Sequence, residues 1–171
     1  MVSEGECIFC KIIRGEIPTN KIYEDSKTIA FLDINPRNPG HTLVIPKKHH
    51  EQLFTLSDEE GTAIFSALKK VSAQVKNSMK ADGISIVQNN GKAAGQVVWH
   101  AHFHVIPRFE AEGPVALEAV LGVKKMTPEV MNQIADAIKK SEGHSENKEE
   151  KPKEEKKEDK KPEKKKDFFD F

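Results

Sequence analysis

The sequence predicts an α+β fold: an antiparallel five-stranded sheet with one long helix and short helices toward both ends. Short runs rich in β-branched and aromatic residues recur between residues 21 and 106. One amphipathic stretch of helical period separates the third run from the fourth. The links between the early runs are short, which favours antiparallel pairing because parallel neighbours need a long crossover.

The elements expected before the long helix are a short helix over 10–14 and strands over 21–24, 28–32 and 42–45. Gly15 is typical of a helix C-terminus and ends the first helix. Asp25 and Ser26 separate the first two strands, which indicates a hairpin. Prolines and a glycine make 35–40 a loop.

The long helix begins at the capping-box pattern of Ser57 and Glu60 and is expected to end near Asp82 and Gly83. Its apolar face follows helical spacing: Ile64, Leu68, Val71, Val75 and Met79. We then expect a strand over 84–88, a loop over 89–95 and a final strand over 97–106. Thr127, Pro128 and Glu129 open a last helix with Val130, Met131, Ile134 and Ile138 on one face.

The 171 residues are 37% hydrophobic, below the ~45–50% typical of globular chains. The deficit lies at the end of the chain, so we expect a folded domain over 1–143 and a Lys/Glu-rich disordered tail over 144–171. Three phenylalanines close that tail, and exposed aromatic residues favour docking on a protein partner. They are Phe168, Phe169 and Phe171; the alternative is that this end folds back onto its own domain.

The 27 Lys and Arg balance the 27 Asp and Glu. Neither the tail nor the remainder is strongly basic, so nothing indicates a main function in gripping nucleic acid or an anionic membrane. The chain has no apolar run long enough to span a bilayer, and its start lacks the pattern of a signal peptide. We therefore expect a cytoplasmic protein.

Three histidines alternate at His100, His102 and His104 in the last predicted strand. Alternation places their side chains on one face, about 6.6–6.8 Å apart by strand rise. The row admits three interpretations: a solvated polar strand face, a metal site, or a nucleophilic imidazole with supporting imidazoles. Asn89, Gln96 and nearby glycines lie in the preceding loop and offer donors for an anion such as phosphate.

The segment Gln96-Val97-Val98-Trp99-His100-Ala101-His102-Phe103-His104-Val105 resembles the motif of the histidine-triad (HIT) family. Supporting matches lie at 7–18, 30–36 and 40–49, and together they resemble the Hint-like nucleoside phosphoramidase branch. The resemblance implies the HIT fold and an enzyme that cleaves nucleoside 5'-phosphoramidates at the α-phosphate. It implies a covalent nucleotidyl-histidine on His102 and release of a nucleoside monophosphate.

The same resemblance implies that His104 contacts the phosphate and the leaving group, and that His100 and His41 belong to the imidazole network. It places Asn89 and Gln96 near phosphate or leaving-group oxygens and Asp33 at the ribose. Its base-pocket positions are Phe9, Ile12, Ile17, Phe31 and Ile34, although without the resemblance each of the five would more often be part of a plain core. The sequence departs from some relatives at Val97, where a hydroxyl residue would touch the phosphate.

Cys7 and Cys10 form a Cys-x-x-Cys pair, which alone is also compatible with two small buried hydrophobes. By the resemblance, the pair joins His49 and His100 in a closed structural zinc site with one zinc per chain. A homodimer is also implied, because related chains pair their sheets and long helices. Alternatives for the function are a diadenosine polyphosphate hydrolase and a nucleotide-sensing module whose tail binds a partner.

Overall fold

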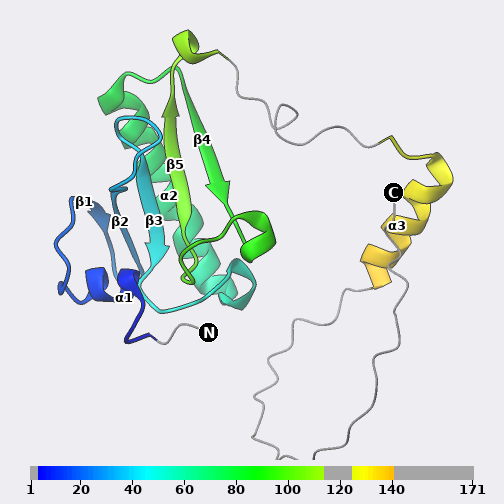
Figure 1. Cartoon of the computed structure of the whole chain (residues 1–171), viewed down its shortest axis with the longest axis horizontal. Helices are drawn as coiled ribbons and strands as arrows, with labels where there is room; N and C mark the ends of the chain where they lie inside the picture. The colour runs from blue at the N-terminus through cyan, green and yellow to red at the C-terminus, as the bar shows by residue number, and fades with distance from the viewer. Residues whose placement is uncertain (1–3, 114–124, 141–171) are drawn as a thin grey trace, which may run out of the picture. The chain divides into compact units, whose positions relative to one another are not determined.

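Five strands form one antiparallel sheet in the computed structural model, which describes residues 4–113 and 125–140 (Figure 1). They are β1 (Lys21–Glu24), β2 (Thr28–Leu32), β3 (Thr42–Pro46), β4 (Gly83–Gln88) and β5 (Phe103–Arg108), in the order β1-β2-β3-β5-β4. Every pairing is antiparallel. The predicted sheet is therefore confirmed, with β4 at one edge of its described part.

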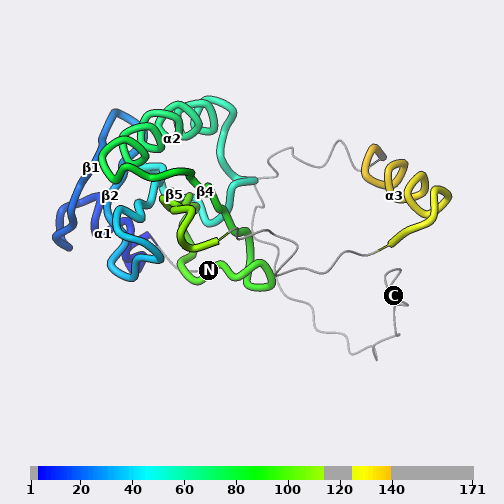
Figure 2. Tube along the Cα trace, turned by 90° about the horizontal axis from the view of Figure 1, so that it is seen from above, coloured from blue at the N-terminus to red at the C-terminus, as the bar shows by residue number. Residues whose placement is uncertain are grey.

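The long helix α2 (Asp58–Met79) covers one face of this sheet (Figure 2). The predicted capping box is present, since Ser57 Oγ accepts from the Glu60 backbone N–H and the Glu60 carboxylate accepts from that of Ser57. The helix ends at Lys80, whose φ of 53° is left-handed. Its buried side chains pack on the sheet: Ile64, Ala67, Leu68, Val71 and Val75 against Ala30, Val44, Phe103 and Val105.

The short helix α1 (Ile8–Ile13) begins earlier than the predicted range of 10–14. It packs on the opposite face of the sheet, where Cys7, Phe9 and Cys10 join Ile29, Phe31, Leu43 and Ile45 in a second core cluster. This packing places the Cys-x-x-Cys pair against β2 and β3 of the sheet. The face that α2 leaves free is thus covered in part by α1.

The predicted strand over 97–106 is wrong in its first half, because β5 begins at Phe103. His100 and His102 precede it, and their segment follows an irregular path. The backbone N–H of His100 donates to the Val98 carbonyl in a turn, and that of Ala101 donates to the carbonyl of His50. These bonds take the place of ladder bonds to a neighbouring strand.

The predicted last helix is confirmed as α3 (Pro128–Lys140), with the Thr127 hydroxyl accepting from the Val130 N–H. The chain divides into two units at 125/126, and α3 belongs to the second. The predicted tail over 144–171, with Phe168, Phe169 and Phe171, lies outside the described residues. None of the helices in the described ranges is both long and apolar enough to cross a membrane.

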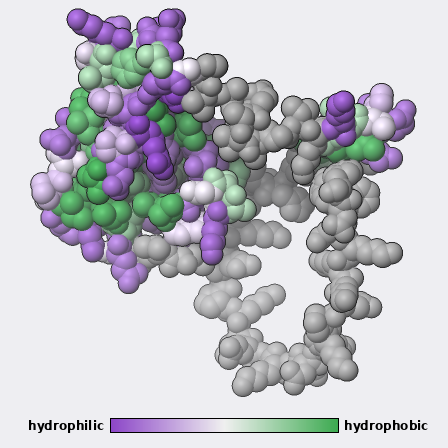
Figure 3. Space-filling model, turned by 45° about the horizontal axis from the view of Figure 1, so that its top comes forward, coloured by the Kyte–Doolittle hydropathy of each residue, from purple (hydrophilic) through white to green (hydrophobic). Residues whose placement is uncertain are grey.

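Hydrophobic side chains reach the surface of the first unit, where they form patches among hydrophilic ones (Figure 3). Ile86 of the edge strand β4 is 52% exposed, and Phe65 of α2 is 76% exposed. Both belong to elements that contribute other side chains to the core, such as Ile84 of β4 and Leu68 of α2.

Candidate active site and metal cluster

A pocket of about 570 Å³ lies beside α1 on the face of the sheet opposite α2. Its size falls within the range of about 300–1,000 Å³ common for small-molecule sites. It brings together most of the residues expected at the site: Phe9, Ile12, Ile17, Phe31, Asp33, Ile34, His41, Asn89, His102 and His104. His100 and Gln96 are outside its lining.

His102 is buried, and its hydrogen bonding fixes which ring nitrogen carries a proton. Nδ1 lies 2.7 Å from the backbone oxygen of His100. A carbonyl only accepts, so Nδ1 carries the proton, and Nε2 keeps a free lone pair. A neutral imidazole held in this tautomer is equipped to act as a nucleophile.

His104 is held by His41 in a second imidazole pair. The His41 Nδ1 accepts from the Arg37 backbone N–H at 3.1 Å, and its Nε2 lies 2.9 Å from Nδ1 of His104. The proton between the rings therefore belongs to His41, which leaves the proton of neutral His104 on Nε2. The rings of His102 and His104 lie 5.0 Å apart between centroids. The unprotonated nitrogen of a neutral His102 and the N–H group of His104 thus lie on neighbouring rings.

Burial keeps the rings of His104 and His41 uncharged. It lowers the pKa of His104 to about 4, assisted by His102 and His41. Burial also lowers the pKa of His41, although the carboxylate of Asp33 acts in the opposite direction. Both rings are consequently neutral near pH 7.

Asp33 lines the pocket beside His41. Its Oδ1 accepts from the Asn35 N–H at 2.9 Å, and its Oδ2 lies 3.6 Å from Nδ1 of His41. A carboxylate has about four lone-pair sites, so acceptors remain for a ligand hydroxyl. In the same pocket, Phe9 and Phe31 make an edge-to-face pair with centroids 5.7 Å apart. Ile34 is 85% exposed and therefore forms part of the rim.

Gln96 is buried and uses its side-chain amide on the protein backbone. Its oxygen accepts from the Gly91 N–H at 2.7 Å, and its nitrogen donates to the Glu51 and Val98 carbonyls at 2.6 and 3.0 Å. The structure thus places Gln96 behind the loop that carries Asn89. Val97 lines the pocket and is 84% exposed.

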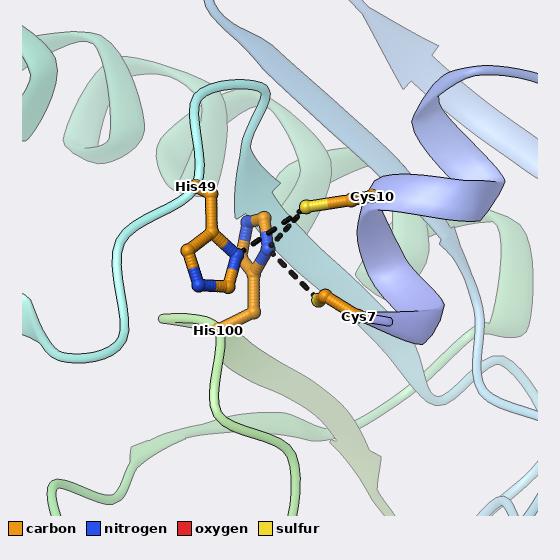
Figure 4. Close-up of side chains that lie close together, drawn as sticks. All are labelled: Cys7, Cys10, His49 and His100. Atoms are coloured by element: carbon orange, nitrogen blue, oxygen red, sulfur yellow. Dashed lines mark hydrogen bonds between the residues drawn. The ribbon is translucent and has the colours of Figure 1, made fainter. Parts of the chain in front are cut away.

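A cluster of two cysteines and two histidines lies where α1 meets residues 97–102, the irregular segment before β5 (Figure 4). The ligand atoms of Cys7, Cys10, His49 and His100 all lie within 4.8 Å of one another and could hold a metal ion. His100 Nε2 donates to the Pro46 carbonyl at 2.9 Å, so the lone pair of Nδ1 faces the two sulfurs at 3.5 and 3.6 Å. The Nδ1 of His49 lies 3.3 Å from Cys10 Sγ.

Two features that sequence reasoning missed depend on long-range contacts. Val87 of β4 pairs with His104 and lines the pocket. His50, next to His49, is buried against Glu60 of α2. Neither position carries a local signal, because a valine in a strand and a histidine beside another histidine each fit many environments.

The fold and the imidazole arrangement define an α+β domain with several histidines gathered at one pocket, and the comparisons with known proteins assign its family. Residues 14–111 match the HIT domain family. The chain belongs to the HIT family. An uncharacterised HIT-like protein of Methanocaldococcus jannaschii is 54% identical over 109 residues, which are 64% of this chain and 84% of that protein.

Two further relatives are named for activities. An adenosine 5'-monophosphoramidase of Candida albicans is 45% identical over 112 residues, 63% of this chain and 74% of that one. An adenylylsulfatase of Arabidopsis thaliana is 35% identical over 137 residues, 80% of this chain and 70% of that one. Among solved structures, a HIT family protein of Bacillus subtilis superimposes with a TM-score of 0.70 at 40% identity, covering 79% of this chain and 96% of its own.

Proposed function

We propose that this chain hydrolyses nucleoside 5'-phosphoramidates at the α-phosphate through a covalent intermediate on His102. The observation that carries the proposal is the unprotonated Nε2 of His102 beside a neutral His104 whose Nε2 carries the proton, both in one pocket. Related proteins named as an adenosine 5'-monophosphoramidase and an adenylylsulfatase support the same reaction class.

In the first step, Nε2 of His102 forms a bond to the α-phosphorus, and the bond from phosphorus to the leaving amine breaks. The Nε2–H of His104 donates a hydrogen bond to that amine, which takes up a proton from solvent water as it leaves. In the second step, the oxygen of a water molecule bonds to phosphorus, the bond to His102 breaks, and the proton that the water loses returns to solvent. The products are a nucleoside monophosphate and an amine. The Nδ1–H of His102, held by the His100 carbonyl, stabilises the charge that the ring acquires.

The nucleoside is proposed to lie on the side of β2 and β3. The free lone pairs of Asp33 suit the ribose hydroxyls, and Phe9, Phe31, Ile12 and Ile17 offer apolar surface to the base. Asn89, on the far side of the histidines, is the proposed side-chain donor to a phosphate oxygen. Gln96 supports it indirectly by bonding the Gly91 N–H.

The leaving group would then point toward β4, where Val87 and Val97 line the pocket. Among the described residues of this lining, Arg37 is the sole Lys or Arg, and it belongs to the loop before His41. A polyphosphate leaving group would meet no Lys or Arg among the lining residues that β4 and the loop after it contribute. This favours a phosphoramidate over the alternative substrate, a diadenosine polyphosphate.

Cys7, Cys10, His49 and His100 are proposed to hold one structural zinc. Tetrahedral zinc bonds of about 2.3 Å to sulfur and about 2.0–2.1 Å to nitrogen separate the two atoms by about 3.6 Å. The three sulfur–nitrogen separations of 3.3, 3.5 and 3.6 Å fit that distance. A zinc bound by these four residues would have no ligand position open, so it would supply no chemistry to the reaction. It would join α1 to residues 97–102, the segment before β5.

A homodimer is proposed through the edge strand β4 and helix α2. β4 has one strand neighbour in the described sheet, and exposed Ile86 and Phe65 offer apolar surface. Light scattering on the wild type and on Ile86→Lys tests this. We expect the mass of two chains for the wild type and of one for the variant, whereas a monomeric wild type would contradict it.

A protein partner of the tail is a separate proposal, based on the three terminal phenylalanines alone. Deleting residues 145–171 should leave turnover and thermal stability unchanged if the tail binds another protein. A loss of stability would indicate that the tail folds back on the domain. A nucleotide-sensing module would bind AMP and lose its partner on the same deletion, without ever showing turnover.

The substrate proposal is tested by initial rates of AMP release from adenosine 5'-phosphoramidate and from a diadenosine polyphosphate. We expect release mainly from the phosphoramidate. Preferential release from the polyphosphate would assign the alternative hydrolase. Binding of AMP with release from neither substrate would favour the sensing module.

A further inference from the structure

His50 is a buried histidine that lies outside the pocket lining, with only 8% of its surface exposed. It belongs to the segment that connects β3 to α2. Its ring joins this connection to the first turn of α2. Nδ1 lies 3.3 Å from the hydroxyl of Thr55 in the connection, and Nε2 lies 3.0 Å from Oε1 of Glu60 in α2. Both ring nitrogens are therefore occupied, as expected of an imidazole that fixes its own backbone.

The backbone of His50 is hydrogen-bonded to residues 97–102, the segment before β5. Its carbonyl accepts from the Ala101 N–H at 2.5 Å. Ala101 is fully buried and stands between His100 and His102. The carbonyl of His100, in the same peptide group as the Ala101 N–H, accepts the Nδ1–H of His102.

These contacts form one continuous chain from helix α2 to the nucleophile. Glu60 is fixed by the capping box at the start of α2, and its other oxygen holds His50. His50 holds the backbone of Ala101, and the adjacent carbonyl orients the ring of His102. Such a brace is needed because β5 begins only at Phe103, so no strand ladder holds 97–102.

We propose that His50 is a positioning residue for the nucleophile: through Glu60 it fixes the Ala101 backbone and thereby the orientation of the His102 ring. This inference rests on the proposed function of His102. It concerns a residue that touches neither the pocket nor a reacting atom. A misplacement of about 1 Å at a reacting group can lower a rate about 100-fold, so a loosened brace should act on turnover.

The position offers a matched pair of substitutions. In His50→Gln the side-chain nitrogen can occupy the place of Nε2 and keep the bond to Glu60. In His50→Asn the amide occupies the place of Nδ1 and keeps only the contact with Thr55. We expect kcat to fall about 10- to 100-fold in His50→Asn and to recover within about 3-fold of wild type in His50→Gln.

The affinity for AMP separates positioning from general damage. Asp33, Phe9 and Phe31 have no hydrogen bond to Glu60, His50 or Ala101, and Phe9 meets only the rings of His100 and His102, by edge-to-face packing. AMP should therefore bind to wild type, His50→Gln and His50→Asn with similar Kd. Ser57→Ala is a stability control, because it removes one capping bond at a cost of about 1 kcal/mol and leaves the bond from Glu60 to His50. It should lower Tm without lowering kcat.

A readout independent of substrate is the Nδ1–H resonance of His102 in nitrogen-15 imidazole spectra. We expect it to be visible in wild type and His50→Gln and to be lost to solvent exchange in His50→Asn. Metal content is measured in parallel, because His49 adjoins His50. Loss of the metal in His50→Asn would overturn a direct effect on His102.

Equal kcat and an equally protected Nδ1–H in His50→Asn and wild type would overturn the proposal. So would a fall in kcat in Ser57→Ala as large as that in His50→Asn. If the wild type cleaves no phosphoramidate, the proposed function fails, and the Nδ1–H exchange still decides whether His50 positions His102.

Discussion

Burial of a neutral His104 should make the stability of this domain fall as the pH is lowered from 7 to 5. The pKa of His104 in the folded protein is about 4, whereas an imidazole in an unfolded chain titrates near 6.5. Between these values the unfolded chain binds a proton that the folded protein does not bind. The free energy of unfolding therefore falls as the pH falls through that window.

The magnitude follows from the two pKa values. Between pH 7 and pH 5, His104 alone lowers the free energy of unfolding by about 2 kcal/mol, and the loss reaches about 3 kcal/mol below pH 4. The lowered pKa values of Glu24, Asp25 and Glu60, each about 2, act mainly below pH 5.

The assay is urea unfolding of wild type and His104→Gln at both pH values. Glutamine fills a similar space and does not titrate, so the variant should lose about 2 kcal/mol less than the wild type between pH 7 and pH 5. The titrating groups that do not interact with His104 cancel in this comparison. Equal losses in the two proteins, or a wild type that gains stability at pH 5, would refute the reasoning.

Three further predictions follow from single contacts. Asp33→Asn should raise KM about 10-fold or more with a smaller change in kcat, because it removes a charged acceptor of the ribose; an unchanged KM in steady-state assays would contradict that role. Cys10→Ser should lower both the bound zinc, measured by atomic absorption, and Tm, and a full zinc complement in the variant would exclude Cys10 as a ligand. Ile64→Ala, at the buried face of α2, should cost about 2–5 kcal/mol in urea unfolding, whereas a cost below about 1 kcal/mol would contradict its place in the core.

Local patterns were sufficient for most of the fold. The capping box of Ser57 and Glu60 and the apolar spacing from Ile64 to Val75 depend on neighbours within one helix, and both appear as predicted. The hairpin of β1 and β2 has the predicted bounds for the same reason. The alternation of histidines predicted a strand at His100 and His102 that is absent, since a segment can alternate in sequence without pairing to a neighbouring strand. Its backbone is bonded instead to His50, 51 residues away in the sequence.

The site was predictable to the extent that its residues share a motif. Asp33, His41, Asn89 and the two last histidines of the triad meet in one pocket, as the family resemblance implies. The roles of Val87 and His50 could not be read from the sequence, because each depends on which strand or helix lies opposite. The buried amide of Gln96 bonds backbone groups, a role that its proximity to the triad does not indicate.

The central claim is that His102 carries a nucleotidyl group during turnover. The most direct test is intact-protein mass spectrometry of wild type and His102→Ala, quenched in acid-free denaturant within the first turnovers of adenosine 5'-phosphoramidate. We predict a transient adduct with the mass of one AMP moiety on the wild type, mapped to His102, and none on the variant. Turnover without any adduct, or with the adduct on another residue, would contradict the account.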